Sequence, residues 1–484
     1  MILQSKWRNG ALALVAVCGA IATALPAQTF KTLHSFSGAD GEYPAQGLMQ
    51  ATNGYLYGTT YEGGIYNEGT VFRITTSGKL TSLYSFCAQS NCPDGNDPSG
   101  LIQATNGNFY GTTYNGGVHN EGTVFEMSAS GALTTMYSFC AQSDCTDGAA
   151  PGPSEGLVQA TNGSFYGTTS VGVVGGLAGT VFRITPGGKL TTLYAFCAQS
   201  GCPDGEYANA GLIQATDGNF YGTTDGGGVY GNYGTIFKIT QSGKLTTLYS
   251  FCAQAGCTDG VYPVAGVIQG SDGNFYGTTY GNPPSQYGTV FKITPSGTLT
   301  TLYTFCAQSK CADGASPWAG LIQATDGNFY GTTAGGGAKG DGTIFKITPG
   351  GTLTTLYSFC AKSGCTDGMT PYGALVQDTD GTFYGTTYNG GVHKLGTVFS
   401  LSVGLGPFVT TLPMSAKLGA AVKILGTNLT GATMVTFNGT PAAFTVVSSS
   451  EVTTTVPAGA TSGTVEVVTP GRTLASSVPF HVLP

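Results

Sequence analysis

Short apolar segments separated by turn residues recur along residues 29–405, and they predict a protein built almost entirely of β-strands. Within one repeat, apolar and β-branched residues gather at 211–215, 219–224, 234–239 and 245–251. Thr-Asp-Gly (216–218) joins the first two segments and Gln-Ser-Gly (241–243) joins the last two, and both suit tight hairpins. Each repeat therefore predicts a four-stranded antiparallel sheet in which consecutive strands are neighbours.

The repeat is marked by the tetrapeptide Tyr-Gly-Thr-Thr, which occurs seven times at intervals of 53 to 56 residues. Its copies begin at Tyr57, Tyr110, Tyr166, Tyr221, Tyr276, Tyr330 and Tyr384. Phe220 and Tyr221 are both large and aromatic although neighbours on a strand point to opposite faces, so both faces of each sheet are expected to be buried. Sheets stacked around the axis of a β-propeller bury both faces in this way.

The two ends of the repeat region are offset in a manner that predicts a closed ring. The last repeat stops after its third strand, at Leu401, whereas a copy of the fourth strand, residues 31–36, precedes the first repeat. The N-terminal strand can complete the last sheet and remove the edges that an open array would expose. We therefore predict an all-β fold, a seven-bladed β-propeller closed by an N-terminal strand, over residues 29–405.

Two segments outside the repeat have patterns of their own. Residues 1–27 carry Lys6 and Arg8, an apolar run and small residues up to Ala27, which together predict a secretory signal peptide. A retained membrane anchor is disfavoured because the run is shorter than the ~20 residues that a span needs. Residues 407–484 hold five further short β-segments and predict a separate immunoglobulin-like β-sandwich.

Composition narrows the classes of partner. The chain has 484 residues, of which 78 are glycine and 9% are charged, and its formal net charge is −7. Basic clusters and basic amphipathic segments are absent from the sequence. Nucleic acid is therefore not expected as a partner, and no membrane span is expected in the mature chain.

Twelve cysteines form six pairs with the spacing Cys-x4-Cys, each directly after a fourth strand. The pairs are Cys87/Cys92, Cys140/Cys145, Cys197/Cys202, Cys252/Cys257, Cys306/Cys311 and Cys360/Cys365. An even number of cysteines in an exported chain predicts local structural disulfides. Zinc is the alternative, but pairs on separate sheets are too far apart to share an ion, so no metal site is assigned.

The long loops of an up-and-down sheet gather at one end, and here they carry the aromatic residues that we take as candidate binding residues. They are Tyr61, Tyr114, Tyr280, Trp318 and Tyr388. Aromatic rings beside polar groups suit the recognition of sugars or extended polymers, since a ring offers apolar area and a polar tip together. The alternative is that these rings only pack the rim of the loops.

Acidic residues give little support for catalysis. An Asp-Gly follows each cysteine pair, but one carboxylate per sheet cannot supply the roughly six to eight oxygens that calcium needs, so turn capping is expected. A nucleophile elbow, a His-Glu-x-x-His motif and a phosphate loop are all missing. No catalytic residue and no cofactor are assigned.

These observations favour a secreted or cell-surface binding or adhesion scaffold, whose partners would be polysaccharide or a cell-surface protein. Two other hypotheses stay open. The first is a carbohydrate-active enzyme, a glycosidase or lyase, that uses loop carboxylates. The second is a purely structural extracellular module.

Two motifs resemble known families. Asp-Gly-Asn-Phe-Tyr-Gly-Thr-Thr (326–333) and Gly-Thr-Ile-Phe-Lys-Ile-Thr (342–348) resemble the GloVer tandem repeat of exported bacterial proteins, and the match extends over residues 29–405. Gly-Thr-Asn-Leu (426–429) and Val-Thr-Phe-Asn-Gly-Thr-Pro-Ala (435–442) resemble an IPT/TIG domain. The first resemblance implies a surface-sorted bacterial protein, and the second implies an immunoglobulin-like fold that occupies the place of a sorting anchor.

Overall fold

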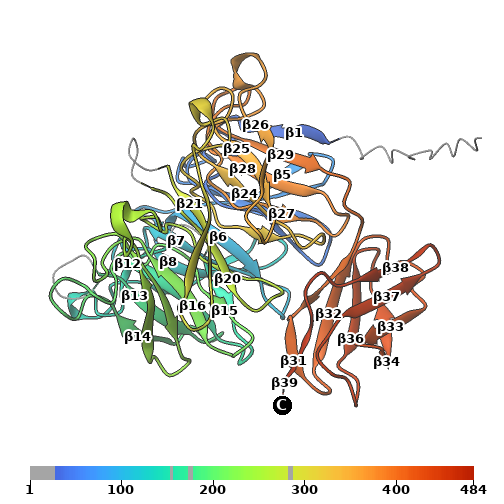
Figure 1. Ribbon diagram of the computed structural model, residues 1–484. Coiled ribbons are helices and arrows are strands. Elements are labelled where there is room, and N and C mark those ends of the chain that lie inside the picture. The colour runs from blue at the N-terminus through green and yellow to red at the C-terminus, as the bar shows by residue number, and fades with distance from the viewer. Residues whose placement is uncertain (1–27, 153–155, 173–177, 282–286, 484) are drawn as a thin grey trace, which may run out of the picture.

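The computed structural model describes residues 28–152, 156–172, 178–281 and 287–483, and these residues form mostly β-structure (Figure 1). The described helices are short 3-10 turns in four of the cysteine loops: η1 (Ser143–Cys145), η2 (Ala255–Cys257), η3 (Ser309–Cys311) and η4 (Ser363–Cys365). In the described part of the chain no helix is long and apolar enough to span a bilayer. The expected signal peptide, residues 1–27, lies outside the described residues.

Seven antiparallel sheets account for the described part of the repeats, and we number them in chain order. Sheet 1 holds β2 (Met49–Gln50), β3 (Leu56–Thr60), β4 (Thr70–Ile74) and β5 (Leu80–Ser85). Sheet 2 holds β6 (Asn96–Gln103), β7 (Phe109–Asn115), β8 (Thr123–Met127) and β9 (Leu133–Ser138). Sheet 3 holds β10 (Ala149–Pro151), β11 (Val158–Gln159), β12 (Phe165–Val171), β13 (Thr180–Ile184) and β14 (Leu190–Ala195).

The later sheets repeat the same order of strands. Sheet 4 holds β15 (Ile213–Gln214), β16 (Phe220–Thr224), β17 (Thr235–Ile239) and β18 (Leu245–Ser250). Sheet 5 holds β19 (Ile268–Gln269), β20 (Phe275–Thr279), β21 (Thr289–Ile293) and β22 (Leu299–Thr304). Sheet 6 holds β23 (Ile322–Gln323), β24 (Phe329–Thr333), β25 (Thr343–Ile347) and β26 (Leu353–Ser358).

Sheet 7 is built from both ends of the repeat region. Its strands are β27 (Val376–Gln377), β28 (Phe383–Thr387), β29 (Thr397–Ser402) and β1 (Thr29–Ser35). β1 pairs antiparallel with β29, with Thr32 opposite Phe399, and lies beside it in Figure 1. The N-terminal strand thus takes the edge position that the fourth strand holds in the other sheets, as the offset of the repeats predicted.

The first two residues of Tyr-Gly-Thr-Thr have packing roles that sheet 4 illustrates. The ring of Tyr221 stacks on Phe275 of sheet 5, with 4.0 Å between ring centroids. A Cβ on Gly222 would lie 2.7 Å from Cζ of Phe237 on the neighbouring strand, so only glycine leaves room for that ring. Phe220 and Tyr221 are both buried, which agrees with the expectation that both faces of the sheet are covered.

The two threonines of the motif satisfy backbone groups. Thr223 Oγ1 donates a hydrogen bond of 2.9 Å to the carbonyl oxygen of Ala265 in the next sheet. Thr224 Oγ1 lies 2.8 Å from Thr235 Oγ1 and accepts the backbone N–H of Thr235 at 3.1 Å. Buried hydroxyls are costly unless they are bonded, so the motif joins strand to strand and sheet to sheet at once.

One hydrogen bond recurs at every interface between successive sheets: a backbone N–H in the turn after a first strand donates to a glutamine side chain. The pairs are Thr52/Gln103, Thr105/Gln159, Thr161/Gln214, Thr216/Gln269, Ser271/Gln323, Thr325/Gln377 and Thr379/Gln50. The last pair joins sheet 7 to sheet 1 across 329 positions, at 3.1 Å. The first and last sheets therefore make the same contact as their neighbours.

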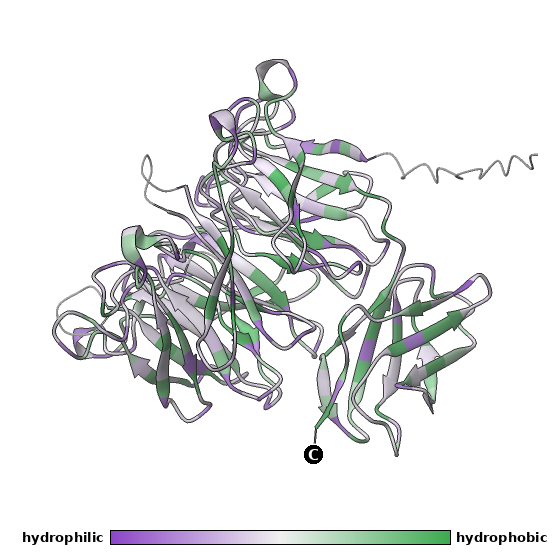
Figure 2. Cartoon of the chain, viewed as in Figure 1, coloured by the Kyte–Doolittle hydropathy of each residue, from purple (hydrophilic) through white to green (hydrophobic). Residues whose placement is uncertain are grey.

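Apolar residues concentrate in the strands (Figure 2), and the buried ones pack between neighbouring sheets. Between sheets 7 and 1, Tyr384 and Val398 pack with Leu48, Leu56 and Phe72 in one buried cluster. Leu56 stands where the other six repeats have phenylalanine. The interface between the two ends of the repeat region thus has a dry core of its own.

The C-terminal region forms a separate β-sandwich. Its strands are β30 (Val409–Leu412), β31 (Ser415–Lys417), β32 (Ala421–Gly426), β33 (Met434–Phe437), β34 (Thr440–Ala442), β35 (Phe444–Val446), β36 (Glu451–Thr455), β37 (Val465–Thr469), β38 (Arg472–Ala475) and β39 (His481–Leu483). β30-β32-β36-β35 and β34-β33-β37-β38 form its two four-stranded sheets, and β31 pairs with β39. All five predicted segments contain strands, whereas β30, β31, β38 and β39 were not predicted.

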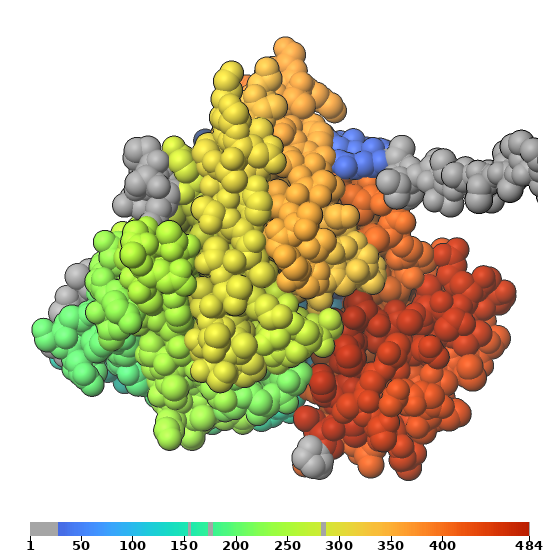
Figure 3. Space-filling view, viewed as in Figure 1, coloured from blue at the N-terminus to red at the C-terminus, as the bar shows by residue number. Residues whose placement is uncertain are grey.

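The sandwich lies against the turns that follow the first strands of sheets 1 and 7 (Figure 3). Ser450 Oγ donates to the carbonyl oxygen of Thr52 at 2.9 Å, and Thr427 Oγ1 lies 2.9 Å from Thr379 Oγ1. The backbone N–H of Phe408 also donates to Thr379. The sandwich therefore contacts sheets 1 and 7 at the end that carries the short turns, opposite the long loops.

Candidate binding surface at the loop end of the sheets

The cysteine loops are stiffened by six disulfides, one for each predicted pair. Cys87 bonds to Cys92, and the same link recurs after the fourth strand of sheets 2 to 6. The clips also hold the neighbouring loop, since Gly117 N–H donates to the carbonyl oxygen of Cys92 at 2.8 Å. Disulfides of this kind persist in oxidising compartments, which suits an exported protein.

The aspartate after each clip caps the turn. In sheet 6, Asp367 Oδ2 accepts the hydroxyl of Tyr357 at 2.7 Å and the backbone N–H of Ala361 at 2.9 Å. Asp147, Asp259 and Asp313 make the same bonds and, like Asp367, are fully buried. These carboxylates are occupied by donors of their own loop, which is the turn-capping role expected from the sequence.

Five aromatic rings at the loop end are in continuous contact, and we call them the aromatic arc. Its members in order of contact are Tyr280, Trp318, Tyr372, Tyr388 and Tyr43. Successive ring centroids are 5.2, 5.3, 5.1 and 4.9 Å apart. Trp318 is 37% exposed and the tyrosines are half-buried, so the arc offers both apolar faces and polar tips to solvent.

The remaining predicted residues, Tyr61 and Tyr114, lie next to the arc without joining it by ring contact among the described residues. Burial raises the pKa of Tyr61 to about 12, with Asp97, Tyr114 and Tyr388 adding to the effect. Burial likewise raises the pKa of Tyr388, and the charges of nearby groups, Tyr43 and Asp97 among them, add to the effect. The structure therefore brings Tyr280, Trp318 and Tyr388 together and places Tyr61 and Tyr114 at their side.

Sheets 3 and 4 break the aromatic pattern with polar residues. The position after Tyr-Gly-Thr-Thr, which holds Tyr61 in sheet 1, holds Ser170 in sheet 3 and Asp225 in sheet 4. Asp225 Oδ1 and Ser170 Oγ are buried without a hydrogen-bond partner. Burial raises the pKa of Asp225 to about 6, while a hydrogen bond from Asn209 opposes the rise. The loop end thus combines aromatic positions with a shorter polar stretch.

Asp97 is a buried carboxylate at a loop position that holds tyrosine, alanine, serine or threonine in the other repeats. It is 8% exposed, has a left-handed backbone with φ of 55°, and accepts Asn115 Nδ2 at 2.7 Å. Burial raises its pKa to about 6, the bond from Asn115 opposes this, and the charges of Glu68 and Glu62 add to it. Buried carboxylates with raised pKa values are typical of functional sites, although structural clusters also produce them.

Sequence reasoning missed Tyr43, Tyr372 and Asp97. Alignment of the loops that follow each Asp-Gly would have found Tyr372, because it occupies the position of Trp318 in the next repeat. Tyr43 and Asp97 share another position in these loops. Tyrosine is frequent enough in this chain that its presence in a loop gave no signal by itself.

Two groups of three potential metal ligands occur among the described residues. They are Cys197, Cys202 and Glu206, and Asp341, Cys360 and Cys365. Both contain a disulfide-bonded pair of cysteines. A disulfide sulfur is not the thiolate that zinc prefers, so neither group carries a metal assignment.

Several solved structures are distantly similar to the chain. The bacterial surface component PorZ of Porphyromonas gingivalis is 14% identical, with a TM-score of 0.49, and the match covers 93% of this chain and 60% of PorZ. A copper-containing fungal alcohol oxidase is 11% identical, with a TM-score of 0.48 and coverage of 94% and 99%. The aldose sugar dehydrogenase of Streptomyces coelicolor is 14% identical, with a TM-score of 0.38 and coverage of 78% and 98%.

No curated protein matches the chain at a significant level. Models of protein families do match. The IPT/TIG domain matches residues 407–482, which form the β-sandwich. The Gloeobacter/Verrucomicrobia repeat matches residues 17–153, 144–312 and 306–440, a span that includes all seven sheets. The chain belongs to the Gloeobacter/Verrucomicrobia repeat family and carries a C-terminal IPT/TIG domain.

Proposed function

We propose that the protein is a non-catalytic binding or adhesion module of the cell exterior that holds polysaccharide on its aromatic arc. The observation that carries this proposal is the unbroken contact of five rings from sheets 5, 6, 7 and 1. The C–H-rich face of a sugar packs well on an aromatic ring, and a row of rings matches the length of an extended polymer. Tyr61 and Tyr114 would extend the surface into sheets 1 and 2.

The proposal includes the scaffold, which we infer to be a closed propeller of seven blades. Support comes from the first threonine of Tyr-Gly-Thr-Thr, whose hydroxyl donates to a backbone carbonyl leading into the next sheet in six of the seven repeats, with Thr112 of sheet 2 as the exception. Thr332 Oγ1 donates to the carbonyl oxygen of Gly373 in sheet 7, and Thr386 Oγ1 donates in the same way to Gln46, which leads into sheet 1, at 2.9 Å. A ring without free edges holds its loops in fixed relative positions, which a multi-ring binding surface requires.

We also infer the cellular location of the protein and the limits of its domains. We infer that residues 1–27 are a signal peptide, that residues 29–405 form the propeller and that residues 407–484 form the sandwich. Six disulfides suit secretion or the cell surface. The sandwich packs at the short-turn end, so a cell-surface attachment there would leave the aromatic arc facing outward.

Asp97 and Asp225 favour a second candidate function, a carbohydrate-active enzyme. Both carboxyls have pKa values raised to about 6 by burial, and Asp97 acts electrostatically on Tyr61 and Tyr388. A protonated carboxyl near neutral pH can serve as a general acid toward a glycosidic oxygen. New reducing ends after incubation with a polysaccharide, lost in both Asp97→Asn and Asp225→Asn, would establish this function in place of simple binding.

The binding proposal is tested by co-sedimentation of the oxidised protein with a panel of insoluble and gelled polysaccharides, including bacterial cell-wall material. We expect retention on at least one polymer and its loss in the double variant Trp318→Ala/Tyr372→Ala. The matched control is Tyr230→Ala, since Tyr230 is 54% exposed and lies outside the arc. Equal retention of the double variant and the wild type would reject the arc as the binding surface.

A further inference from the structure

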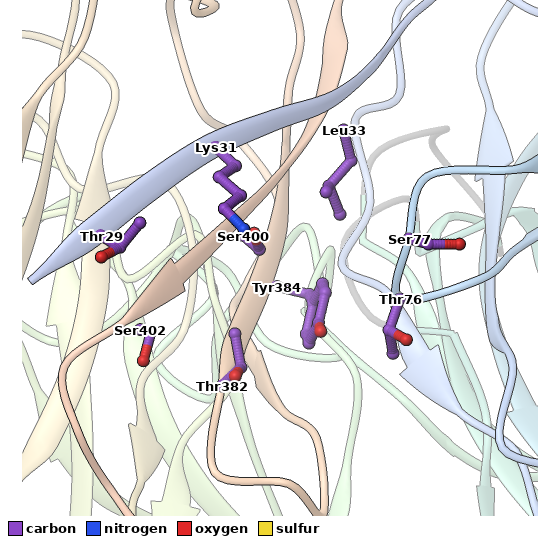
Figure 4. A pocket seen from close by; sticks show the side chains of 9 residues that line it. All are labelled: Thr29, Lys31, Leu33, Thr76, Ser77, Thr382, Tyr384, Ser400 and Ser402. Atoms are coloured by element: carbon purple, nitrogen blue, oxygen red, sulfur yellow. The ribbon is translucent and has the colours of Figure 1, made fainter.

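A cavity lies at the junction of the two ends of the repeat region, away from the aromatic arc. Its volume is about 500 Å³, and it opens between sheet 7 and the turn that joins β4 to β5 in sheet 1 (Figure 4). Its lining is contributed by Thr29, Lys31, Leu33, Thr76, Ser77, Thr382, Tyr384, Ser400 and Ser402. We call it the Lys31 pocket.

The pocket sits where other repeats place a long charged side chain. The third strand pairs one residue with the tyrosine of Tyr-Gly-Thr-Thr, and in chain order this residue is Arg73, Glu126, Arg183, Lys238, Lys292, Lys346 and Ser400. Lys238 Nζ lies over the ring of Tyr221, 5.6 Å from its centroid, and 2.8 Å from Asp217 Oδ2. Ser400 is too short to make either contact, so the space beside Tyr384 stays open.

In sheet 7 the positively charged side chain beside the tyrosine is a lysine of β1, the strand that pairs with β29. Lys31 lies opposite Ser400 in the register of β1 and β29, a position that holds threonine in the other six sheets. Among the described residues Lys31 makes no ion pair, in contrast to Lys238 and Lys292. Asp380, which corresponds to Asp217, accepts the backbone N–H of Thr382 through Oδ1 at 2.8 Å. The ammonium of Lys31 is thus the one cation of the lining and has no carboxylate partner among the described residues, although the charges of Asp380 and Asp378 act on Tyr384.

The rest of the lining is rich in hydroxyl groups. Seven of the nine lining residues are serine, threonine or tyrosine, and none is a carboxylate. Figure 4 shows Thr382 and Ser77 on either side of Tyr384, with the hydroxyl of Ser77 directed away from the other lining side chains. Hydroxyls both donate and accept hydrogen bonds, and a single ammonium favours one negative charge. The volume lies within the range of small-ligand sites.

We propose that the Lys31 pocket binds an anionic sugar, with its carboxylate or sulfate on the Lys31 ammonium and its ring hydroxyls on the serine and threonine side chains. Leu33 supplies an apolar contact for the ring. The pocket is formed by the β4–β5 turn and by β1, β28 and β29 of sheet 7 with the turn before β28, whereas the arc lies in the long loops, so this proposal does not rest on the function proposed for the arc.

The test is titration of the full oxidised chain with glucuronate, glucose 6-sulfate and glucose, followed by calorimetry or ligand-observed NMR. We expect one or both anionic sugars to bind at least about tenfold more tightly than glucose, since a charge-assisted hydrogen bond contributes that much. The tighter of the two identifies carboxylate or sulfate as the preferred anion. No binding of either, or equal binding of glucose, would overturn the proposal.

Four variants locate the binding. Lys31→Gln is expected to weaken the anionic sugar about tenfold, and Ser400→Lys is expected to block the pocket by restoring the long side chain of the other repeats. Lys244→Gln, an exposed lysine of sheet 4, is the matched control and should bind as the wild type does. If Ser400→Lys does not fold, Lys31→Gln decides alone, and unchanged affinity in it contradicts the proposal. Trp318→Ala should leave this binding intact, which separates the pocket from the arc.

Discussion

The imidazole Nε2 of His34 lies 2.7 Å from Oδ2 of Asp40, at the place where the other six sheets put a tyrosine hydroxyl on the corresponding aspartate. Sheet 7, which receives its edge strand from the N-terminus, thus keeps the same cap with a different donor. The first repeat also lacks a disulfide clip, so Asp40 is held by His34 and by Ser37, whose N–H and hydroxyl both donate to Oδ1. The aspartate cap is more general in this fold than the clip.

His34 can be replaced to test the cap. His34→Tyr restores the donor of the other sheets, whereas His34→Phe differs from it by one hydroxyl and leaves Oδ2 of Asp40 without its partner. We expect His34→Phe to be about 1–2 kcal/mol less stable than His34→Tyr at pH 7, the usual contribution of a hydrogen bond to a charged group. Urea unfolding of the two variants measures the difference, and equal midpoints would show that the cap contributes nothing.

The pH dependence of the same cap has a definite sign. Burial alone would raise the pKa of Asp40, but the hydrogen bonds from His34 and Ser37 outweigh it and lower the pKa from 3.8 to about 2. The charged carboxylate therefore stabilises the fold above pH 4, and this contribution is lost as the pH falls toward 2. Asp40→Asn should lack that part of the acid dependence, which unfolding curves between pH 2 and 7 would reveal.

Asp97 is expected to behave in the opposite way. Its pKa in the fold is about 6, above the 3.8 of a free side chain, so the protein loses stability as the pH rises from 4 to 6. Asp97→Asn should be about 3 kcal/mol more stable than the wild type at pH 8 and no more stable at pH 4. Asp144→Asn is the matched control because Asp144 is exposed and has a similar φ of 57°. An equal gain in both variants would assign the effect to the backbone rather than to the buried charge.

The threonine bond between sheets 7 and 1 provides a test of the ring. Thr386 Oγ1 bonds to Gln46, whereas Thr112 Oγ1, at the same position of sheet 2, is buried without a partner. Thr386→Val should cost about 1 kcal/mol and Thr112→Val should cost nothing or stabilise, since it removes an unsatisfied hydroxyl. Thermal unfolding compares the two. Equal behaviour would argue against a bonded interface between the first and last sheets.

One disulfide clip is expected to be dispensable for folding. Cys306→Ser/Cys311→Ser should lower the stability by about 2 kcal/mol, the loop-closure effect for so short a loop, while the far-ultraviolet circular dichroism spectrum stays that of the wild type. The reason is that the first repeat folds without a clip and keeps its aspartate cap. Loss of the β-spectrum in this variant would show that the clip is required.

The repeated parts of the fold could be predicted from the sequence because each follows from local chemistry. Tyr-Gly-Thr-Thr has the same role in every sheet, and the displaced copy at residues 31–36 indicated where β1 would pair. The very short first strands, such as β15 (Ile213–Gln214), were predicted too long, because the residues before them lead in from the loop without ladder partners. The order of the sheets along the chain could be predicted from the repeat period alone.

The candidate surface was predictable only in part. Trp318 and Tyr388 were identifiable as loop aromatics, but their connection runs through Tyr372, which comes from another loop and has no distinctive motif. The Lys31 pocket exists because Ser400 replaces the long charged residue of the other repeats, and Lys31 replaces the threonine that lies opposite it. These two residues belong to strands at opposite ends of the repeat region. A substitution of this kind indicates a pocket only when the pairing of the two strands is known.

The most direct measurement is the affinity of Trp318→Ala, relative to Tyr230→Ala, for the polysaccharide that retains the wild-type protein. Trp318 is in contact with Tyr280 and Tyr372. Removal of an aromatic ring that stacks on a ligand usually weakens binding by about 1–3 kcal/mol. The account predicts an affinity at least about tenfold lower for Trp318→Ala and unchanged for Tyr230→Ala. Wild-type affinity in Trp318→Ala, with the fold intact, would contradict it.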